Sequence, residues 1–345
     1  MKKVNLLSIL ILTVLLGACT GGQKKGTLAG AGATFPLPFY NIAFKNYQEL
    51  NNINVTYGGV GSGGGIRSLQ DKIVDFAGSD AYLSEKEMSE MPAVLHIPSC
   101  MGAVVLAYNL PNVEKVNLNG EVIADIYMGK ITSWSDSRIA ELNPDVELPN
   151  LRINPVYRSD GSGTTFVFTD YLSKVSEEWK SKMGVGKAIK WSVGVASKGN
   201  PGVAGTVKES VGSIGYIGSE YSFALAIPVA KLRNSAGNFI EPNTASISAA
   251  ASAEMPDDMR VMITNSSAAD AYPISCFTWL LLYKEQAYDN RTKEKAVLTV
   301  NLLKWMMTSE AQKITEKVHY APLPKSAIEK SLNALNSITY NGEKL

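Results

Sequence analysis

Histidine is nearly absent from this chain, and cysteine is scarce. The two histidines, His96 and His319, are isolated, and no group of histidine, cysteine and acidic residues has the spacing of metal ligands. A serine hydrolase would also lack an obvious base to activate its nucleophile. The sequence therefore predicts neither a metal site nor a cofactor, and it argues against hydrolytic chemistry.

An excess of charge of either sign is lacking too. The chain has 33 lysine and arginine residues against 32 aspartate and glutamate residues, a net charge of +1. Since no basic face could neutralise a run of phosphates, nucleic acid is not an expected partner. The 45% of hydrophobic and 19% of charged residues are typical of a globular chain, and 345 residues suggest two domains.

The N-terminal segment has the pattern of a processing signal. Residues 1–18 contain the basic start MKK, an apolar stretch of 13 residues and small residues before Cys19. That stretch is too short for a permanent membrane helix, and LLGAC resembles a lipobox, where bacteria cleave before a cysteine and acylate its sulfur. The alternative is a plain secretory peptide that contains a cysteine. We expect an exported protein with a lipid on Cys19 and a flexible tether over residues 19–27.

The other two cysteines, Cys100 and Cys276, lie in apolar, strand-like runs. An oxidising compartment permits a disulfide between them. Buried free thiols, which behave as small hydrophobic groups, fit the same positions. The sequence leaves both alternatives open.

Short apolar runs alternate with helical patterns along the chain, which indicates an α/β architecture. Two long strand-like segments, 101–109 and 272–283, are the places where we expect the chain to cross between lobes. The other expected strands are 53–59, 74–80, 151–157 and 212–218, and the expected helices are 37–50, 65–72, 84–91 and 292–310.

Three turns share a composition of glycine with serine or threonine at the start of a helix. Thr34 lies in the first, Ser62 in the second, and Ser162 with Thr164 in the third. A helix N-terminus has unpaired N–H groups and a partly positive charge, a capping hydroxyl adds a donor, and glycine permits close approach of a ligand. One such turn is an ordinary capped helix, but three in one chain favour an anion site.

More specific interpretations of these glycines are weak. Gly59, Gly61 and Gly64 fit the spacing G-x-G-x-x-G of a dinucleotide site, but an exported protein would have to find its nicotinamide outside the cytosol. No lysine completes a phosphate-binding P-loop. Neither Ser62 nor Ser162 has the flanking glycines of a nucleophile elbow. The serines are better donors than nucleophiles.

Two charged residues sharpen the prediction at the third turn. Arg158 could place its guanidinium on an oxyanion that the helix N-terminus also holds, and Asp160 could orient that arginine. The alternative is a surface ion pair that contributes almost nothing to stability.

Asp80 ends a strand-like run and would lie near the anion site, where a carboxylate should repel an anion unless the anion carries a proton. Hydrogen phosphate carries one near neutral pH, and sulfate does not. Asp80 would then exclude sulfate, which would face an unpaired charge. The sequence permits a second interpretation equally well, in which Asp80 caps the following helix.

Six motifs occur in the order in which they occur in the phosphate-binding proteins of high-affinity phosphate ABC transporters. They are GAGATFP, YGGVGSGGG, DFAGSDAYLS, DIYMGKITSW, YRSDGSGTTFVFTDYL and KGNPGV, and the resemblance runs from about residue 28 to about residue 325. It implies a type II periplasmic-binding-protein fold of class α/β, with two α/β lobes joined by a crossing-strand hinge and the ligand cleft between them. The expected lobes are residues 28–106 with 272–345, and residues 107–271.

The resemblance also implies the atoms that bind phosphate. Asp80 corresponds to the acidic acceptor of the family, and Asp160 to the aspartate that orients the arginine. The implied ligands are Thr34, Phe35, Ser62, Asp80, Arg158, Ser162, Gly163 and Thr164.

We therefore expect a monomeric, lipid-anchored receptor on the extracytoplasmic side of a membrane. It would capture inorganic phosphate without chemistry and deliver it to an ABC permease, whose ATPase would supply the energy because this chain has no nucleotide-hydrolysing motif. A receptor for sulfate or molybdate, and a secreted phosphoesterase, are the competing hypotheses.

Overall fold

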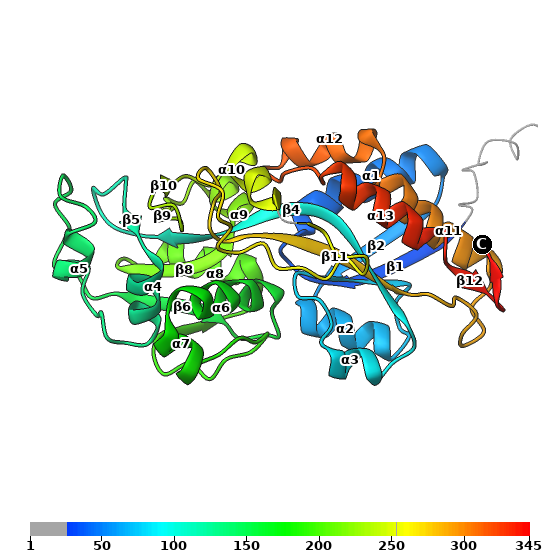
Figure 1. The fold of residues 1–345 in the computed structure, drawn as a ribbon, viewed down its shortest axis with the longest axis horizontal. Coiled ribbons are helices and arrows are strands. Elements are labelled where there is room, and N and C mark those ends of the chain that lie inside the picture. The colour runs from blue at the N-terminus through cyan, green and yellow to red at the C-terminus, as the bar shows by residue number, and fades with distance from the viewer. Residues whose placement is uncertain (1–25, 253) are drawn as a thin grey trace, which may run out of the picture.

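The computed structural model describes residues 26–252 and 254–345. The expected signal peptide, Cys19 and all of the expected tether before Gly26 lie outside these residues. Figure 1 shows two lobes side by side, each with helices packed around strands. We call the lobe that contains β1, β2 and β3 the first lobe, and the lobe that contains β6, β7 and β8 the second lobe.

One eight-stranded sheet runs through both lobes. β1 is parallel to β2 and β3 in the first lobe, and β6 is parallel to β7 and β8 in the second. In spatial order the strands are β2 (Asn54–Gly59), β1 (Thr27–Gly32), β3 (Phe76–Ser79), β11 (Ser275–Tyr283), β4 (Val94–Tyr108), β8 (Ser213–Gly218), β6 (Asn154–Arg158) and β7 (Val195–Ser197).

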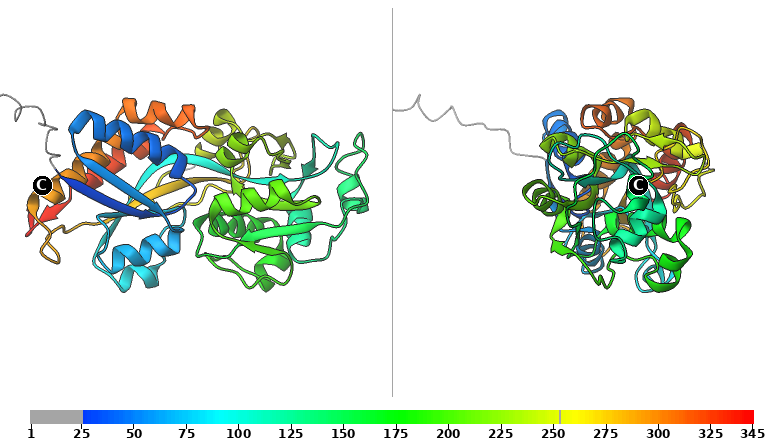
Figure 2. Two further views of the ribbon diagram at one scale, coloured as in Figure 1. Left: turned by 180° about the vertical axis from the view of Figure 1, so that it is seen from behind. Right: turned by 90° about the vertical axis from the view of Figure 1, so that its left-hand side faces the viewer.

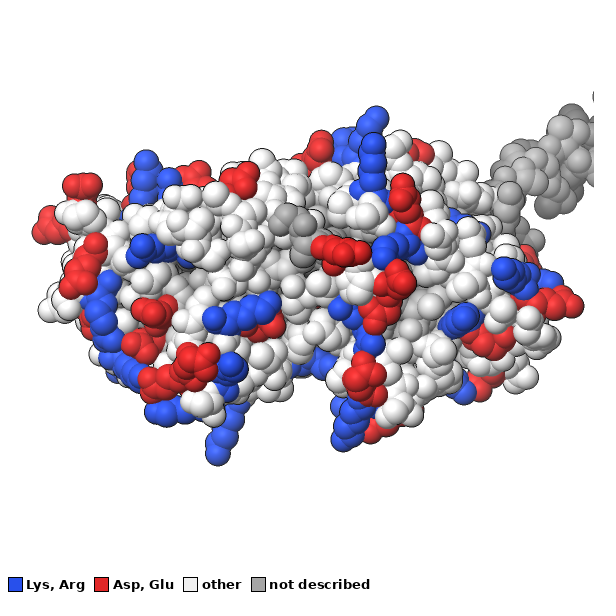
Figure 3. All heavy atoms as spheres, in the orientation of Figure 1, with Lys and Arg blue, Asp and Glu red and all other residues white. Residues whose placement is uncertain are grey.

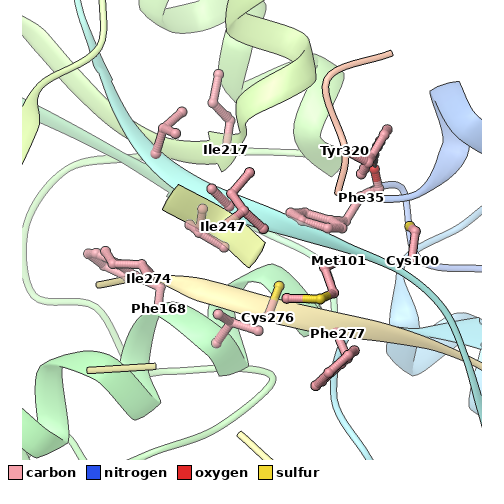
Figure 4. Packing of buried hydrophobic residues seen from close by; sticks show 14 of the residues in the cluster. Phe35, Cys100, Met101, Phe168, Ile217, Ile247, Ile274, Cys276, Phe277 and Tyr320 are labelled. Carbon is pink, nitrogen blue, oxygen red and sulfur yellow. Dashed lines mark hydrogen bonds between the residues drawn. The ribbon is translucent and has the colours of Figure 1, made fainter. Parts of the chain in front are cut away.

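β4 and β11 connect the two halves of the sheet. Residues 94–103 of β4 pair with β11, and residues 104–108 pair with β8, so one continuous strand belongs to both lobes. Every residue of β11 is buried, as are all residues of β4 except Leu95. Figure 4 shows Phe35, Met101 and Phe277 packed around these two strands. The two segments predicted to cross between lobes are therefore β4 and β11, although β4 begins earlier, at Val94.

Helices cover both faces of the sheet in the first lobe, where α1 and α11 to α13 lie on one side and α2 and α3 on the other (Figures 1 and 2). The first lobe has α1 (Leu37–Asn51), α2 (Ser62–Gln70), α3 (Glu85–Ser89), α11 (Lys293–Met306), α12 (Ser309–Lys317) and α13 (Lys325–Leu335). The rest of the chain has α4 (Gly120–Tyr127), α5 (Ser137–Ala140), α6 (Gly163–Val175), α7 (Glu177–Lys182), α8 (Gly199–Glu209), α9 (Ser219–Leu225), α10 (Thr244–Ala249) and the 3₁₀ turn η1 (Ala250–Ser252). Short strands complete the fold: β5 (Asn117–Leu118), β9 (Lys231–Arg233), β10 (Phe239–Ile240), β12 (Thr339–Tyr340) and β13 (Glu343–Lys344).

The single helix predicted over 292–310 is wrong in one respect. α11 ends at Met306, and α12 begins at Ser309. The hydroxyl of Thr308 accepts a hydrogen bond from the amide of Ala311 and so caps a new helix. The apolar pattern continues across this turn, and for that reason periodicity did not reveal it.

Cys100 and Cys276 are free thiols in the structure, and both are buried. In the ladder between β4 and β11, Cys100 lies opposite Thr278 and Cys276 opposite Gly102, so the two cysteines do not face each other. Burial raises the pKa of both thiols well above the usual value.

On the face shown in Figure 3, acidic and basic side chains are interspersed over both lobes. Within the described part of the chain, no helix combines the length and apolar character needed to span a bilayer.

Candidate anion site between the lobes

The residues predicted from the three turns lie together where the two lobes meet. All eight are buried: Thr34, Phe35, Ser62, Asp80, Arg158, Ser162, Gly163 and Thr164. The loop after β1 and the N-terminus of α2 come from the first lobe, and the N-terminus of α6 from the second. Segments that are more than 100 residues apart in the chain therefore form one polar site.

Ser62 joins three segments of this site. It is the first residue of α2, and its hydroxyl accepts hydrogen bonds from the amide of Gly163 at 3.0 Å and from the amide of Asp80 at 3.3 Å. A Cβ at position 163 would lie 2.5 Å from the Ser62 hydroxyl, so only glycine permits this approach. Ser62 does not cap its own helix, because the capping position is Gly61.

Asp80 is 1% exposed and sits at the centre of the site. Its carboxylate accepts a hydrogen bond from the Thr278 hydroxyl at 2.8 Å and a longer one from the Thr164 hydroxyl at 3.4 Å. Burial raises the pKa of Asp80 to about 7, although the hydrogen bond from Thr278 and the positive charge of Arg158 act in the opposite direction. The interpretation of Asp80 as a helix cap is wrong, because Ser84 caps α3.

Arg158 supplies a guanidinium group to the site. Its side chain is 1% exposed, and Asp160 holds it through two hydrogen bonds of 2.8 and 2.6 Å. A third N–H points to the Thr164 hydroxyl at 3.3 Å, which leaves two of its five N–H groups for a ligand. Burial would raise the pKa of Asp160, but hydrogen bonds from Arg158 and the Gly199 amide outweigh it and lower that pKa. The predicted pairing of Arg158 with Asp160 is thus present in the structure, with the guanidinium buried and the Asp160 side chain 14% exposed.

The loop that carries Thr34 and Phe35 is held through its carbonyl groups. The Tyr221 hydroxyl donates to the carbonyl of Thr34, and the Tyr320 hydroxyl donates to the carbonyl of Phe35, both at 2.5 Å. The Phe35 ring packs edge-on against the Tyr320 ring (Figure 4). Among the described residues, the backbone N–H of Phe35 has no acceptor. It is therefore available to a ligand.

Ser162 is a true N-cap. Its hydroxyl accepts from the amide of Thr165 at 3.0 Å, and its own amide donates to the carbonyl of Lys187 at 2.8 Å. The 13-residue helix α6 then directs its partly positive end into the site. The cap geometry expected at all three turns occurs only here.

Three further residues of the site escaped the sequence analysis. Asn200 bridges the hydroxyls of Thr34 and Thr164 at 3.1 Å each, and Thr278 orients Asp80. Glu220 is a second buried acid, whose carboxyl oxygens have no hydrogen-bond partner among the described residues. Burial raises its pKa well above the usual value, against the effect of the nearby Tyr320 hydroxyl. Only Asn200 had a signal in the sequence, since it lies in the motif KGNPGV.

This arrangement suits a small oxyanion. Amides, hydroxyls, one guanidinium and a helix N-terminus supply donors, and Asp80 supplies one acceptor. Within residues 26–252 and 254–345, no cluster of three or more histidine, cysteine or acidic residues is placed to hold a metal ion. The geometry therefore supports recognition of an anion that carries a proton.

Comparison with known proteins gives a consistent result. A family model described as a PBP superfamily domain matches residues 18–310. The phosphate-binding protein PstS of Xylella fastidiosa is 38% identical over 311 residues, which cover 89% of this chain and 84% of that protein. PstS of Pasteurella multocida is 38% identical over 334 residues, which cover 95% and 94%.

The fold has solved counterparts as well. The crystal structure of a phosphate-binding protein from Stenotrophomonas maltophilia matches with a TM-score of 0.65 and 21% identity, covering 88% of this chain and 92% of that one. The predicted fold of two α/β lobes joined by crossing strands is thereby confirmed. Since the sequence likeness extends over nearly the whole length of its relatives, this chain belongs to the PBP superfamily and, within it, to the PstS phosphate-binding proteins.

Proposed function

We propose that this protein is an extracytoplasmic receptor that binds inorganic phosphate between its lobes and delivers it to an ABC permease and its ATPase. The relatives named as phosphate-binding proteins support this function. The observation that carries it is the position of Asp80, a buried acceptor among donors. Hydrogen phosphate satisfies such a site, because its proton can bind the carboxylate while its other oxygens accept hydrogen bonds.

The proposed ligands are the side chains or amides of Thr34, Phe35, Ser62, Asp80, Arg158, Ser162, Gly163 and Thr164. Asp160 acts indirectly, by holding the guanidinium of Arg158 in place. The buried position of the eight proposed ligands supports the assignment, because water is excluded and each hydrogen bond to the anion is strengthened.

Release of phosphate then requires the lobes to separate. We assign residues 28–106 with 272–345 to one lobe and 107–271 to the other, with β4 and β11 as the hinge. Phosphate shifts the population toward the closed form, and the permease distinguishes the two forms by shape. No covalent bond is made or broken in this cycle. The protein acts as a monomer, held at the membrane by a lipid on Cys19, and mass spectrometry of membrane-extracted protein tests that anchor.

Titration calorimetry of the phosphate-free protein tests the function. We expect heat with phosphate, little heat with sulfate or molybdate at pH 8, and no turnover of a phosphate ester. Tight binding of sulfate at that pH would contradict the role of Asp80 and favour a receptor for another oxyanion. Turnover of the ester would favour a secreted phosphoesterase instead.

A further inference from the structure

Asn200 lies at the centre of the contacts between the lobes without being one of the proposed phosphate ligands. It is fully buried, and its side-chain amide lies between the hydroxyls of Thr34 and Thr164. We propose that Asn200 is a positioning residue that makes both hydroxyls hydrogen-bond donors toward phosphate. This inference rests on the proposed function and deepens it.

The orientation of the Asn200 amide is fixed by its neighbour. The backbone N–H of Gly218 points to the side-chain oxygen of Asn200 at 3.1 Å. Since a backbone N–H can only donate, the atom that it meets must be the oxygen. The side-chain nitrogen of Asn200, with its two hydrogens, is therefore the atom that faces Thr34 and Thr164.

The Thr34 hydroxyl has both of its acceptor positions occupied by Asn200. The backbone amide of Asn200 donates to it at 3.0 Å, and the side-chain nitrogen donates at 3.1 Å. A hydroxyl has two lone pairs and one hydrogen. With both lone pairs engaged, its hydrogen must point away from Asn200, and Thr34 can contribute to the site only as a donor.

Thr164 is arranged in the same way. Its hydroxyl accepts from Arg158 at 3.3 Å and from Asn200 at 3.1 Å. Its single hydrogen remains for an acceptor in the site, which in the structure is the carboxylate of Asp80 at 3.4 Å. One asparagine thus sets the polarity of two hydroxyls that face the anion.

This polarity depends on closure, because Asn200 belongs to the second lobe and Thr34 to the first. Asn200 follows Gly199, whose φ of +68° favours glycine and whose amide donates to Asp160 at 3.0 Å. The start of α8 is therefore fixed to the same aspartate that orients Arg158. When the lobes separate, the Thr34 hydroxyl loses both of its donors and becomes free to act as an acceptor. The Thr34 hydroxyl is therefore restricted to donating, as an anion requires, only in the closed form.

Calorimetric titration of phosphate into phosphate-free variants tests this inference. The variants are Asn200→Ala, Asn200→Asp, Thr34→Val and the double variant Asn200→Ala with Thr34→Val. We expect Asn200→Ala to weaken phosphate binding by about tenfold or more. The same change should weaken binding much less in the Thr34→Val background, where only Thr164 remains to be oriented.

Asn200→Asp separates positioning from packing. Aspartate has nearly the same shape but only accepts hydrogen bonds, so we expect it to bind phosphate more weakly than Asn200→Ala does. A residue that only fills space would give the opposite order. Asn234→Ala is the matched control, because Asn234 is also buried and its side-chain nitrogen also donates hydrogen bonds. Its three acceptors are the carbonyls of Ala268, Ala269 and Ala271, away from the site.

The outcomes are distinct. Thermal unfolding should show a loss of stability for Asn234→Ala with unchanged phosphate affinity. The positioning role would be overturned if Asn200→Ala weakened phosphate binding equally in the wild-type and Thr34→Val backgrounds. It would also be overturned if Asn200→Asp bound phosphate with wild-type affinity. Either result would leave the proposed function intact. Absence of phosphate binding by the wild-type protein would overturn both.

Discussion

The two lobes meet along two seams that differ in chemistry. One is the hinge of β4 with β11, and the other is the polar interface around the candidate anion site, which we call the cleft. The hinge is a paired backbone ladder of buried, mostly apolar residues, although the Thr278 hydroxyl on β11 donates to Asp80. The cleft is held by polar contacts between segments that are distant in the chain. Gly63 donates to the carbonyl of Gly161 at 2.9 Å, and Lys187 pairs with Glu87 at 2.5 Å.

The difference indicates which contacts can change. β4 is continuous through both lobes, so we expect its ladder to survive a change of the angle between them. The contacts across the cleft join separate loops and can be lost together when the lobes part. Hydrogen bonds and ion pairs suit such a seam because water replaces them at a small net cost in free energy. Exposure of the apolar residues of the hinge to water would cost much more free energy.

Arg158→Ala should have the largest effect, because it removes polar contacts on which the cleft depends. The variant loses two N–H groups for the anion and leaves the partly buried Asp160 without its partner. We expect phosphate affinity to fall by a factor of about 100 or more, because each hydrogen bond to a charged group contributes roughly 1.5–3 kcal/mol.

Calorimetry measures the loss of affinity. Arg158→Lys should recover only part of it, since lysine cannot hold Asp160 and the anion at once. Arg138→Ala, which removes ion pairs with Asp125 and Asp136 at the surface, is the control and should bind phosphate normally. Near wild-type affinity of Arg158→Ala would show that the guanidinium does not contact the ligand.

Asp80→Asn should change selectivity and its dependence on pH. Burial raises the pKa of Asp80 to about 7, so below pH 7 the wild-type carboxyl is protonated and can donate to sulfate. We expect wild-type sulfate binding to strengthen by about tenfold from pH 8 to pH 6, and Asp80→Asn to bind sulfate equally at both.

The raised pKa of Asp80 also makes the stability of the folded protein depend on pH. Because the folded-state value is raised, the contribution of Asp80 to stability is full below the unfolded value of 3.8 and is lost as pH rises through 7. Thermal unfolding of ligand-free Asp80→Asn should lack this decline with pH.

The outcome for sulfate is a separate test of the selectivity role of Asp80. If Asp80→Asn still discriminated strongly against sulfate, that role would be contradicted.

The sequence was sufficient for residues whose chemistry is local. Arg158 and Asp160 are two positions apart, and the turn at Ser162 follows the ordinary rules for capping. The strand of 74–80 and the crossing segments were evident from apolar runs, because buried strands need no polar alternation.

Contacts between residues that lie far apart in the chain could not be predicted in this way. Asn200 and Thr34 are 166 residues apart, and Thr278 reaches Asp80 only through the neighbouring strands β3 and β11. Glu220 could not be predicted for the same reason, because it lies near Tyr320 only through the packing of distant segments. No local pattern encodes these partners.

Glu87→Gln should have a smaller effect, on the rate of phosphate release. Lys187 and Glu87 bridge the lobes with side chains 22% and 26% exposed, and the carbonyl of Lys187 also holds the amide of Ser162. Burial acts to raise the pKa of Glu87, but the hydrogen bond from Lys187 outweighs it and lowers that pKa. Since a partly exposed ion pair contributes about 1 kcal/mol or less, we expect phosphate to dissociate roughly threefold faster.

Stopped-flow measurement of dissociation at low and high salt checks this expectation, and salt should reduce the difference between wild type and variant. Glutamine preserves the capping box with Ser84, so α3 should remain intact. Glu90→Gln is the matched control, because Glu90, the residue that follows α3, pairs with Lys86 and both side chains are exposed. An equal effect of both substitutions would show that the contact across the lobes does not hold the cleft closed.

The smallest effect is expected at the hinge, where phosphate should change nothing. Cys100 and Cys276 are buried on β4 and β11, and burial raises the pKa of both thiols, so neither should react with a thiol reagent in the native protein. Labelling should appear only on unfolding, and phosphate should not alter its extent or rate below the unfolding transition. If removal of phosphate exposed either thiol, the ladder between β4 and β11 would have to open with the cleft, and the two seams would no longer be separable. Because one continuous strand serves both lobes, we expect the polar seam to part while the apolar seam only bends.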